Sequence, residues 1–170
     1  MANITIEGFE SYLQQLNALR ADSLKICKAV VYPGAAILAE KIRAETEALP
    51  TISDAEAIGN FRAGEENKAL SVSQKAGLVE SLGISGIKKD RSGMVQASVG
   101  FTGYNSIKSN RWPNGQPNAM VARSLEKGTS FLKRDRFVER AVKAAREEAI
   151  AAMAAEADAY IEKKMKENGG

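Results

Sequence analysis

Side chains that could act as catalysts are few in this sequence, and none has the neighbours that catalysis requires. Histidine is absent, which removes the commonest general base and every triad built on imidazole. Ser73 and Lys75 could form a serine–lysine dyad, but no supporting pattern surrounds them. The adjacent acids Glu65–Glu66 and Glu147–Glu148 are typical of solvated surfaces, since neighbouring helical residues point in different directions. The sequence therefore predicts a protein that is not an enzyme.

Ligands for metals or cofactors are equally scarce. The single cysteine, Cys27, excludes an internal disulfide framework and a cysteine zinc site. Its helical surroundings leave two interpretations, a small buried apolar residue or a reactive thiol, and the first is favoured. No P-loop and no dinucleotide fingerprint occurs among the glycines. We expect no metal and no cofactor.

Basic side chains gather in three places that could contact a partner. The candidates are Lys88, Lys89 and Arg91 in a turn, Lys108, Arg111 and Trp112 in a later loop, and Arg134 and Arg136 at the start of the last helix. Positive charge beside an aromatic ring is one way to hold single-stranded nucleic acid. The alternative function is therefore a small nucleic-acid-binding protein that uses its basic central segment. Contact with other protein chains is favoured, because cations at a helix start oppose the dipole and indicate an acidic partner.

Trp112 has two interpretations of equal weight. It either packs back onto the neighbouring hairpin or serves as an interface hot spot in a loop rich in Pro, Gly and Asn.

The charge is distributed unevenly along the chain. The net charge is +3, but residues 1–60 carry 5 basic and 8 acidic groups, 61–140 carry 14 and 7, and 141–170 carry 5 and 6. A basic middle between mildly acidic ends suits head-to-tail contact between copies. The 170 residues fit one domain with 44% hydrophobic and 26% charged residues. Without a signal peptide or membrane-spanning apolar run, synthesis in the cytoplasm and no membrane contact are expected.

Helices are predicted at both ends of the chain. Residues 8–48 should form a first helix from near Gly8 and a second that is capped by Asp22 or Ser23, with a kink or split at Pro33–Gly34. The C-terminal helix should span 134–167, and its alanine-rich face requires close neighbours. The face expected to be buried consists of Val138, Val142, Ala145, Ala149, Met153, Ala157 and Tyr160.

Strands and loops are predicted between these helices. Residues 51–74 should be an irregular excursion, 78–101 an antiparallel hairpin with a polar turn at Lys88–Gly93, 102–118 a loop, and 119–126 a third strand. The fold class is thus α+β, with a small antiparallel sheet of three to four strands packed against the N-terminal helices and the long C-terminal helix. Its open edges should pair with another copy.

Three stretches, in order, resemble the gene-ten-like tail-component family of long-tailed double-stranded DNA bacteriophages. They are the opening from Ile6 to the helix end at Leu49–Pro50, the segment Ala76–Leu82, and Ala122–Ser130 with Phe137 and Ala141. The residues that carry the similarity are Gly77, Leu78, Ser81, Glu126, Gly128, Thr129, Phe137 and Ala141. The chain departs from the family at Ala76, at Arg136 and in two enlarged loops.

The matching residues between Glu126 and Phe137 have architectural roles in this interpretation. Glu126 would end a strand, Gly128 would take a positive φ, and Thr129 or Ser130 would cap the next element of the chain. Phe137 would lock the last helix onto the sheet.

The resemblance implies a structural virion protein of the head–tail junction, a neck, tail-completion or tail-terminator-like component made in the host cytoplasm. It implies a homo-oligomeric ring, most often a hexamer, that contacts connector, tail-terminator or tail-tube proteins. DNA would pass through the lumen without sequence-specific binding.

Overall fold

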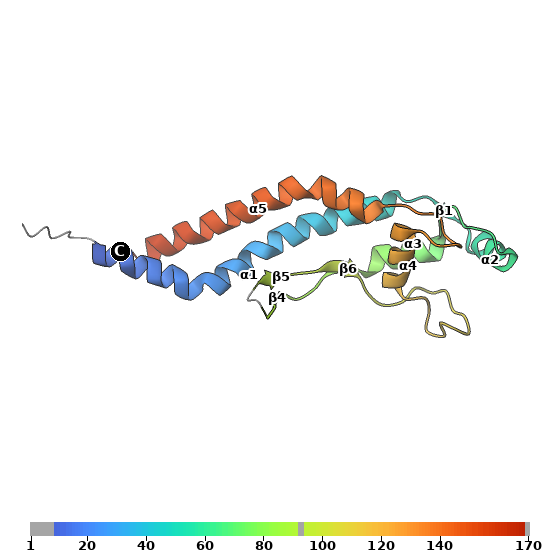
Figure 1. Cartoon of the computed structure of the whole chain (residues 1–170), viewed down its shortest axis with the longest axis horizontal. Helices are drawn as coiled ribbons and strands as arrows, with labels where there is room; N and C mark the ends of the chain where they lie inside the picture. The colour runs from blue at the N-terminus through green and yellow to red at the C-terminus, as the bar shows by residue number, and fades with distance from the viewer. Residues whose placement is uncertain (1–8, 92–93, 169–170) are drawn as a thin grey trace, which may run out of the picture.

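The computed structural model describes residues 9–91 and 94–168, which form a long helical hairpin with a small α+β lobe at one end. Helix α1 (Phe9–Ala48) and helix α5 (Phe137–Asn168) run antiparallel and side by side (Figure 1). Ion pairs join them at Lys41–Glu148, 3.1 Å, and at Glu45–Arg140, 2.8 Å. The predicted α+β class and the predicted long C-terminal helix are confirmed.

Helix α1 is continuous, so the predicted division into two helices is wrong. Pro33 lies inside it and leaves one backbone carbonyl without its helical donor, at a cost of about 3 kcal/mol. Packing against α5 on both sides of Pro33 offsets that cost. Asp22 does not begin a second helix; its carboxylate accepts from Lys25 Nζ at 2.7 Å and pairs with Lys164 of α5. Figure 1 shows that α1 bends along its length.

Small residues allow the two long helices to approach closely. A Cβ atom placed on Gly34 would lie 2.5 Å from Met153 Sδ, so only glycine leaves that side chain undisturbed. Ala35 of α1 and Ala141 and Ala145 of α5 are also buried. The predicted close packing of the alanine-rich face is confirmed. Burial of that face is less complete than predicted, because only Ala145 is fully buried and Val142 is 45% exposed. The other predicted residues are half-buried: Val138, Ala149, Met153, Ala157 and Tyr160.

Residues 51–74 are not irregular, in contrast to the prediction. Strand β1 (Thr51–Ile52) pairs in parallel with β2 (Leu70–Ser71), and helix α2 (Asp54–Ala63) lies between them in the chain. Ser53 caps α2 at its start, and Gly64 ends it with φ +75°. None of the residues of α2 is buried. The apolar periodicity that would have revealed this helix is therefore absent.

The predicted hairpin exists, but it begins later than residue 78. Helix α3 (Val72–Ser81) comes first, with a capping box between Ser71 and Gln74. Strand β3 (Leu82–Ile84) then pairs antiparallel with β6 (Val99–Phe101), and β4 (Lys88–Lys89) pairs with β5 (Val95–Gln96). Gly77, Leu78 and Ser81 consequently lie on a helix rather than at the start of a strand.

The strand predicted at 119–126 is helix α4 (Asn118–Lys127). Val121, Ala122 and Leu125 are buried together, which is the period of a helix and not of a strand. Without this strand the sheet does not reach three or four strands, and the strands described here pair two by two. The loop predicted at 102–118 is confirmed as far as Pro117.

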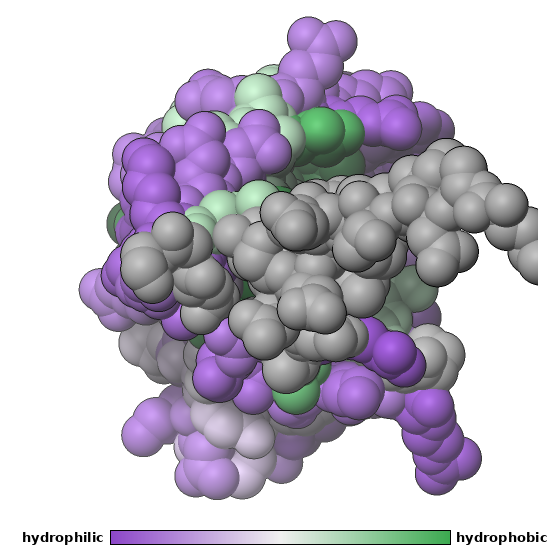
Figure 2. Space-filling model, turned by 90° about the vertical axis from the view of Figure 1, so that its left-hand side faces the viewer, coloured by the Kyte–Doolittle hydropathy of each residue, from purple (hydrophilic) through white to green (hydrophobic). Residues whose placement is uncertain are grey.

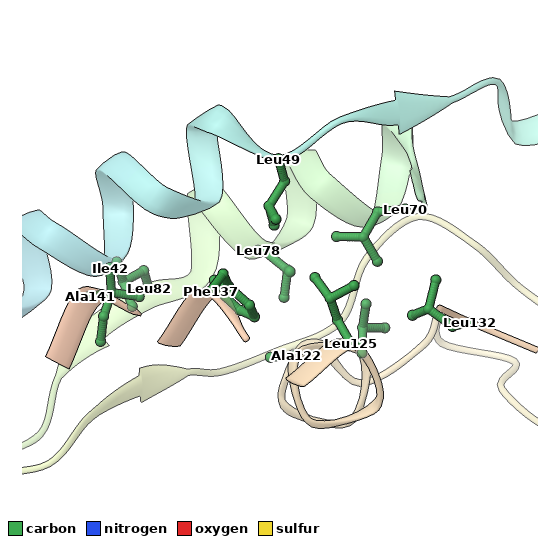
Figure 3. Close-up of a cluster of buried hydrophobic side chains, with 11 residues drawn as sticks. Ile42, Leu49, Leu70, Leu78, Leu82, Ala122, Leu125, Leu132, Phe137 and Ala141 are labelled. Atoms are coloured by element: carbon green, nitrogen blue, oxygen red, sulfur yellow. The ribbon is translucent and has the colours of Figure 1, made fainter. Parts of the chain in front are cut away.

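The core forms where the lobe meets the ends of α1 and α5. Figure 3 shows side chains from both long helices, α3, α4 and the turn before α5 converging on one cluster. Leu78 and Phe137 are completely buried there. The rings of Phe137 and Phe101 of β6 lie 6.0 Å apart, so Phe137 fastens α5 to the β3–β6 ribbon as expected.

Candidate interaction surfaces

The connection between α4 and α5 is organised by Glu126. Its two carboxylate oxygens accept from the backbone N–H groups of Val138, 3.0 Å, and Glu139, 3.1 Å. These N–H groups belong to the first turn of α5 and have no partner within that helix. A negative charge at this position also complements the helix dipole. Glu126 therefore caps α5 from a neighbouring helix, rather than ending a strand.

Gly128 and Thr129 turn the chain between the two helices. Gly128 has φ +76°, as predicted, and a Cβ there would lie 3.0 Å from Arg134 Cβ. Thr129 Oγ1 accepts from the N–H groups of Phe131, 3.3 Å, and Leu132, 3.1 Å. Thr129 thus stabilises a tight turn and does not cap a helix.

The remaining residues of the sequence resemblance are buried or half-buried. Leu78, Phe137 and Ala141 are fully buried. A Cβ on Gly77 would lie 2.7 Å from both Asn105 Cβ and Asn118 Oδ1, so glycine lets the loop and α4 approach α3. The Ser81 carbonyl accepts from Thr102 N–H at 3.2 Å. These positions hold the fold together, and of them only Ser81 is half-buried rather than buried.

Arg134 and Arg136 line a shallow depression at the start of α5, together with Asp135, Glu139, Arg140 and Lys143. Both have intramolecular partners, because Arg134 Nε donates to the Glu126 carbonyl at 3.2 Å and Arg136 donates to Glu139 at 3.1 Å. Lys143 and then Arg136 lower the pKa of Glu139. The acids of this depression and Glu126 offset the dipole cost of the cations.

An acidic partner for this region is supplied by the chain itself. Arg140 donates to Asp135 at 2.7 Å and to Glu45 of α1 at 2.8 Å. These two carboxylates, Asp135 first, raise the pKa of Arg140. The acidic N-terminal segment therefore meets the start of α5 within one molecule.

The β4–β5 ribbon carries the first group of predicted contact residues. Lys88, Lys89 and Arg91 are exposed, and no ion pair among the described residues involves them. The ribbon is closed by Asp90, whose N–H donates to the Met94 carbonyl and whose carboxylate accepts from Met94 N–H, both at 2.9 Å. Met94 is 64% exposed beside these cations.

The loop between β6 and α4 carries the second group. Lys108 and Arg111 are exposed, and the Arg111 guanidinium carbon lies 5.4 Å from the centre of the Trp112 ring. This loop and the β4–β5 ribbon lie far apart along the molecule (Figure 1). The structure therefore does not unite the predicted contact residues into one surface.

An exposed aromatic pair was not predicted from the sequence. The rings of Phe61 on α2 and Phe131 lie 5.0 Å apart, and the side chains are 59% and 44% exposed. Asn67 joins their segments, since its N–H donates to the Phe131 carbonyl at 2.9 Å and its amide donates to Ala57. Phe61 and Phe131 are 70 positions apart, so no local pattern connects them.

The groups considered for catalysis have structural partners. Ser73 donates to Asp54, and Lys75 Nζ donates to the carbonyls of Glu47, 2.7 Å, and Leu49, 2.8 Å. Lys75 is thus held at the end of α1 and does not pair with Ser73. Cys27 is exposed, which contradicts the favoured buried position.

Two further properties concern the described part of the chain only. It contains no cluster of three or more His, Cys, Asp or Glu side chains suited to a metal ion. None of its helices has an apolar stretch of the length needed to span a membrane. Figure 2 shows the molecule from the end where α1 begins, and among the coloured residues of this view hydrophilic ones predominate. Comparison with protein-family models, with characterised proteins and with solved structures finds no match.

Proposed function

We propose that this chain is a non-enzymatic structural protein of the head–tail junction of a long-tailed bacteriophage. It would act as a neck, tail-completion or tail-terminator-like component that joins or finishes the tail during assembly. The resemblance in Ala76–Leu82 and Ala122–Ser130 supports this proposal. In the structure, Leu78, Leu82, Ala122 and Leu125 of these segments belong to the core, and Glu126 caps the connection between α4 and α5.

The observation that carries the proposal is the narrow β3–β6 ribbon with its open edges. Among the described strands, β3 and β6 pair only with each other. Ser85 N–H donates to the Ser98 carbonyl at 2.7 Å. Because hydrogen-bonded pairs alternate along an antiparallel ribbon, the backbone N–H of Ile84 points away from β6. An unpaired edge of this kind is a template for a strand of another chain.

Self-association through such edges explains why a small lobe would carry so short a ribbon. Two-stranded ribbons are marginally stable alone and gain from an added strand. A contact that joins different surfaces of identical copies closes into a ring if the rotation allows. We propose a homo-oligomeric ring, with a hexamer as the first expectation, that binds connector, tail-terminator or tail-tube proteins in the virion. DNA would pass through its lumen.

Native mass spectrometry and light scattering across a concentration series test self-association. Wild type should form oligomers, Ile84→Pro should remain a folded monomer because it lacks the outward N–H, and Ile84→Val should associate like wild type. Far-UV circular dichroism checks the fold of each variant. A wild-type protein that stays monomeric throughout, and that binds neither purified connector nor tail-tube proteins, would contradict the proposal.

A further inference from the structure

The loop between β6 and α4 lies in a long stretch without acidic side chains. From Arg91 to Leu125 the sequence contains no Asp and no Glu, whereas Arg91, Lys108, Arg111 and Arg123 are basic. The acids that flank this stretch both bind backbone N–H groups, Asp90 at the ribbon tip and Glu126 at the start of α5. A polyanion that reaches the loop therefore meets no carboxylate within it.

Polar contacts at its base give this loop a defined shape without a partner. Asn105 N–H donates to the Gln116 carbonyl and Asn118 N–H donates to the Gly103 carbonyl, both at 3.0 Å. Asn105 Oδ1 also accepts from Ile107 N–H at 3.0 Å. At Gly115, φ is +105° and a Cβ would lie 1.9 Å from the Asn105 carbonyl oxygen. A preformed loop loses less conformational entropy when it binds.

Aromatic rings accompany the cations of the loop. Tyr104 is 61% exposed, and Trp112 is partly exposed with the Arg111 guanidinium 5.4 Å from its ring centre. Backbone hydrogen bonds in both directions between Ser109 and Trp112, 3.1 and 3.0 Å, hold the turn that places Trp112. Lys108 and Arg111 take part in no ion pair among the described residues. Their charges are available to an anionic ligand.

We infer that this loop binds single-stranded nucleic acid. Lys108 and Arg111 contact the phosphates, and Tyr104 and Trp112 provide faces on which unpaired bases stack. Duplex DNA offers the phosphates but keeps its base faces stacked. An acidic protein surface offers charge without flat rings. Single-stranded nucleic acid therefore uses both features of the loop, and this inference does not depend on the self-association proposed above.

Trp112 makes a direct test possible because it is the only tryptophan in the chain. Titration of the wild-type protein with an oligo(dT) of about 12 nucleotides, a length within the usual range of site sizes, should quench its fluorescence. Binding should weaken between about 50 and 200 mM salt. In the variant Lys108→Ala/Arg111→Ala the negative slope of log K against log salt should become shallower by about 1.4, since each phosphate contact on a single strand contributes about 0.7 to its steepness.

Matched variants separate the loop from general positive charge. Lys163→Ala/Lys166→Ala removes two exposed lysines near the other end of the molecule and should bind like wild type. For the variants that lack Trp112, binding is measured by the anisotropy of a labelled oligonucleotide. Trp112→Ala should lose roughly tenfold or more in affinity, and Trp112→Phe should retain most of the affinity. Circular dichroism confirms that each variant is folded.

Three results would overturn the inference. The first is no binding of oligo(dT) at low salt, and the second is equal weakening by the loop variant and the control variant. The third is binding of duplex DNA or polyglutamate as tightly as oligo(dT), which would show that charge alone is recognised. Self-association of the wild type is measured separately and remains interpretable under each result.

Discussion

Removing the Glu126 carboxylate tests how α4 and α5 are joined. In Glu126→Ala, the N–H groups of Val138 and Glu139 lose acceptors at 3.0 and 3.1 Å, and the start of a 32-residue helix loses a negative charge. The cap lies beside the fully buried Phe137. Loosening of the first turn would therefore also disturb the core.

The expected cost can be estimated from these contacts. Loss of a helix cap typically costs about 1 kcal/mol, and loss of a favourable charge at a helix start adds about 0.3–1 kcal/mol. With some disturbance of Phe137 we expect a total of about 2 kcal/mol. For a chain of this size, each kcal/mol shifts Tm by about 2–4 °C, so Tm should fall by about 4–8 °C.

Thermal unfolding followed by circular dichroism at the helical band measures this shift. Glu126→Gln keeps an acceptor oxygen without the charge and should lose about half as much as Glu126→Ala. Glu148→Ala is the control, because Glu148 lies on α5, the helix that Glu126 caps, in an exposed pair with Lys41 at 3.1 Å. Exposed pairs contribute about 0–1 kcal/mol. Equal Tm values for Glu126→Ala and Glu148→Ala would refute the role of Glu126 as a cap.

Three other predictions concern glycines and one carboxylate, all measured by chemical or thermal unfolding. Gly77→Ala should destabilise the fold by about 1–3 kcal/mol, because the added Cβ would lie 2.7 Å from Asn105 and Asn118. Gly59→Ala has open space around it and should stabilise α2 by up to about 1 kcal/mol. Equal effects of the two substitutions would contradict this account. Gly34→Ala should be nearly neutral, since the flexible Met153 side chain can move and the helix gains propensity, but Gly34→Leu should destabilise the α1–α5 contact by about 1–3 kcal/mol; a harmless leucine would contradict close packing there. Hydrogen bonds from Ser73 and then Ser71 lower the pKa of Asp54 below its ordinary value of 3.8. The ionised Asp54 carboxylate therefore stabilises the folded state above pH 3.8, and this stabilisation is lost as the pH falls through the lowered pKa. The free energy of unfolding of wild type should decline more steeply with acid than that of Asp54→Asn, and identical acid profiles would rule this out.

The sequence by itself was sufficient to predict the long C-terminal helix, the helical character of residues 8–48 and the class of fold, although not the continuity of α1. Helix α5 is alanine-rich from Ala141 to Ala159, and this local propensity needs no neighbour to be recognised. The hairpin of β3 to β6 was also recognised from alternation, although Leu78 was assigned to it incorrectly. In this part of the chain the deciding interactions are close in sequence.

Tertiary structure decided the elements whose local patterns are ambiguous. In the ten residues of α4, apolar side chains recur at every second position and also three and four positions apart, so the local pattern fits a strand as well as a helix. Burial of Val121 and Leu125 against the core selects the helix. Helix α2 has no buried residue and therefore no apolar stripe to detect. Pro33 remains inside α1 because α5 contacts that helix on both sides of the proline, at Asp22 and at Lys41.

Among the candidate contact residues, too, some features are visible in the sequence and others arise only in the folded structure. Lys108, Arg111 and Trp112 were identified from residue type alone, because charge and aromatic rings are visible in any sequence. The cap by Glu126 and the contact of Phe61 with Phe131 depend on residues that the fold brings together from separate elements. Such contacts form only when chain entropy is offset by burial of a shared core, so no local stretch of sequence determines them.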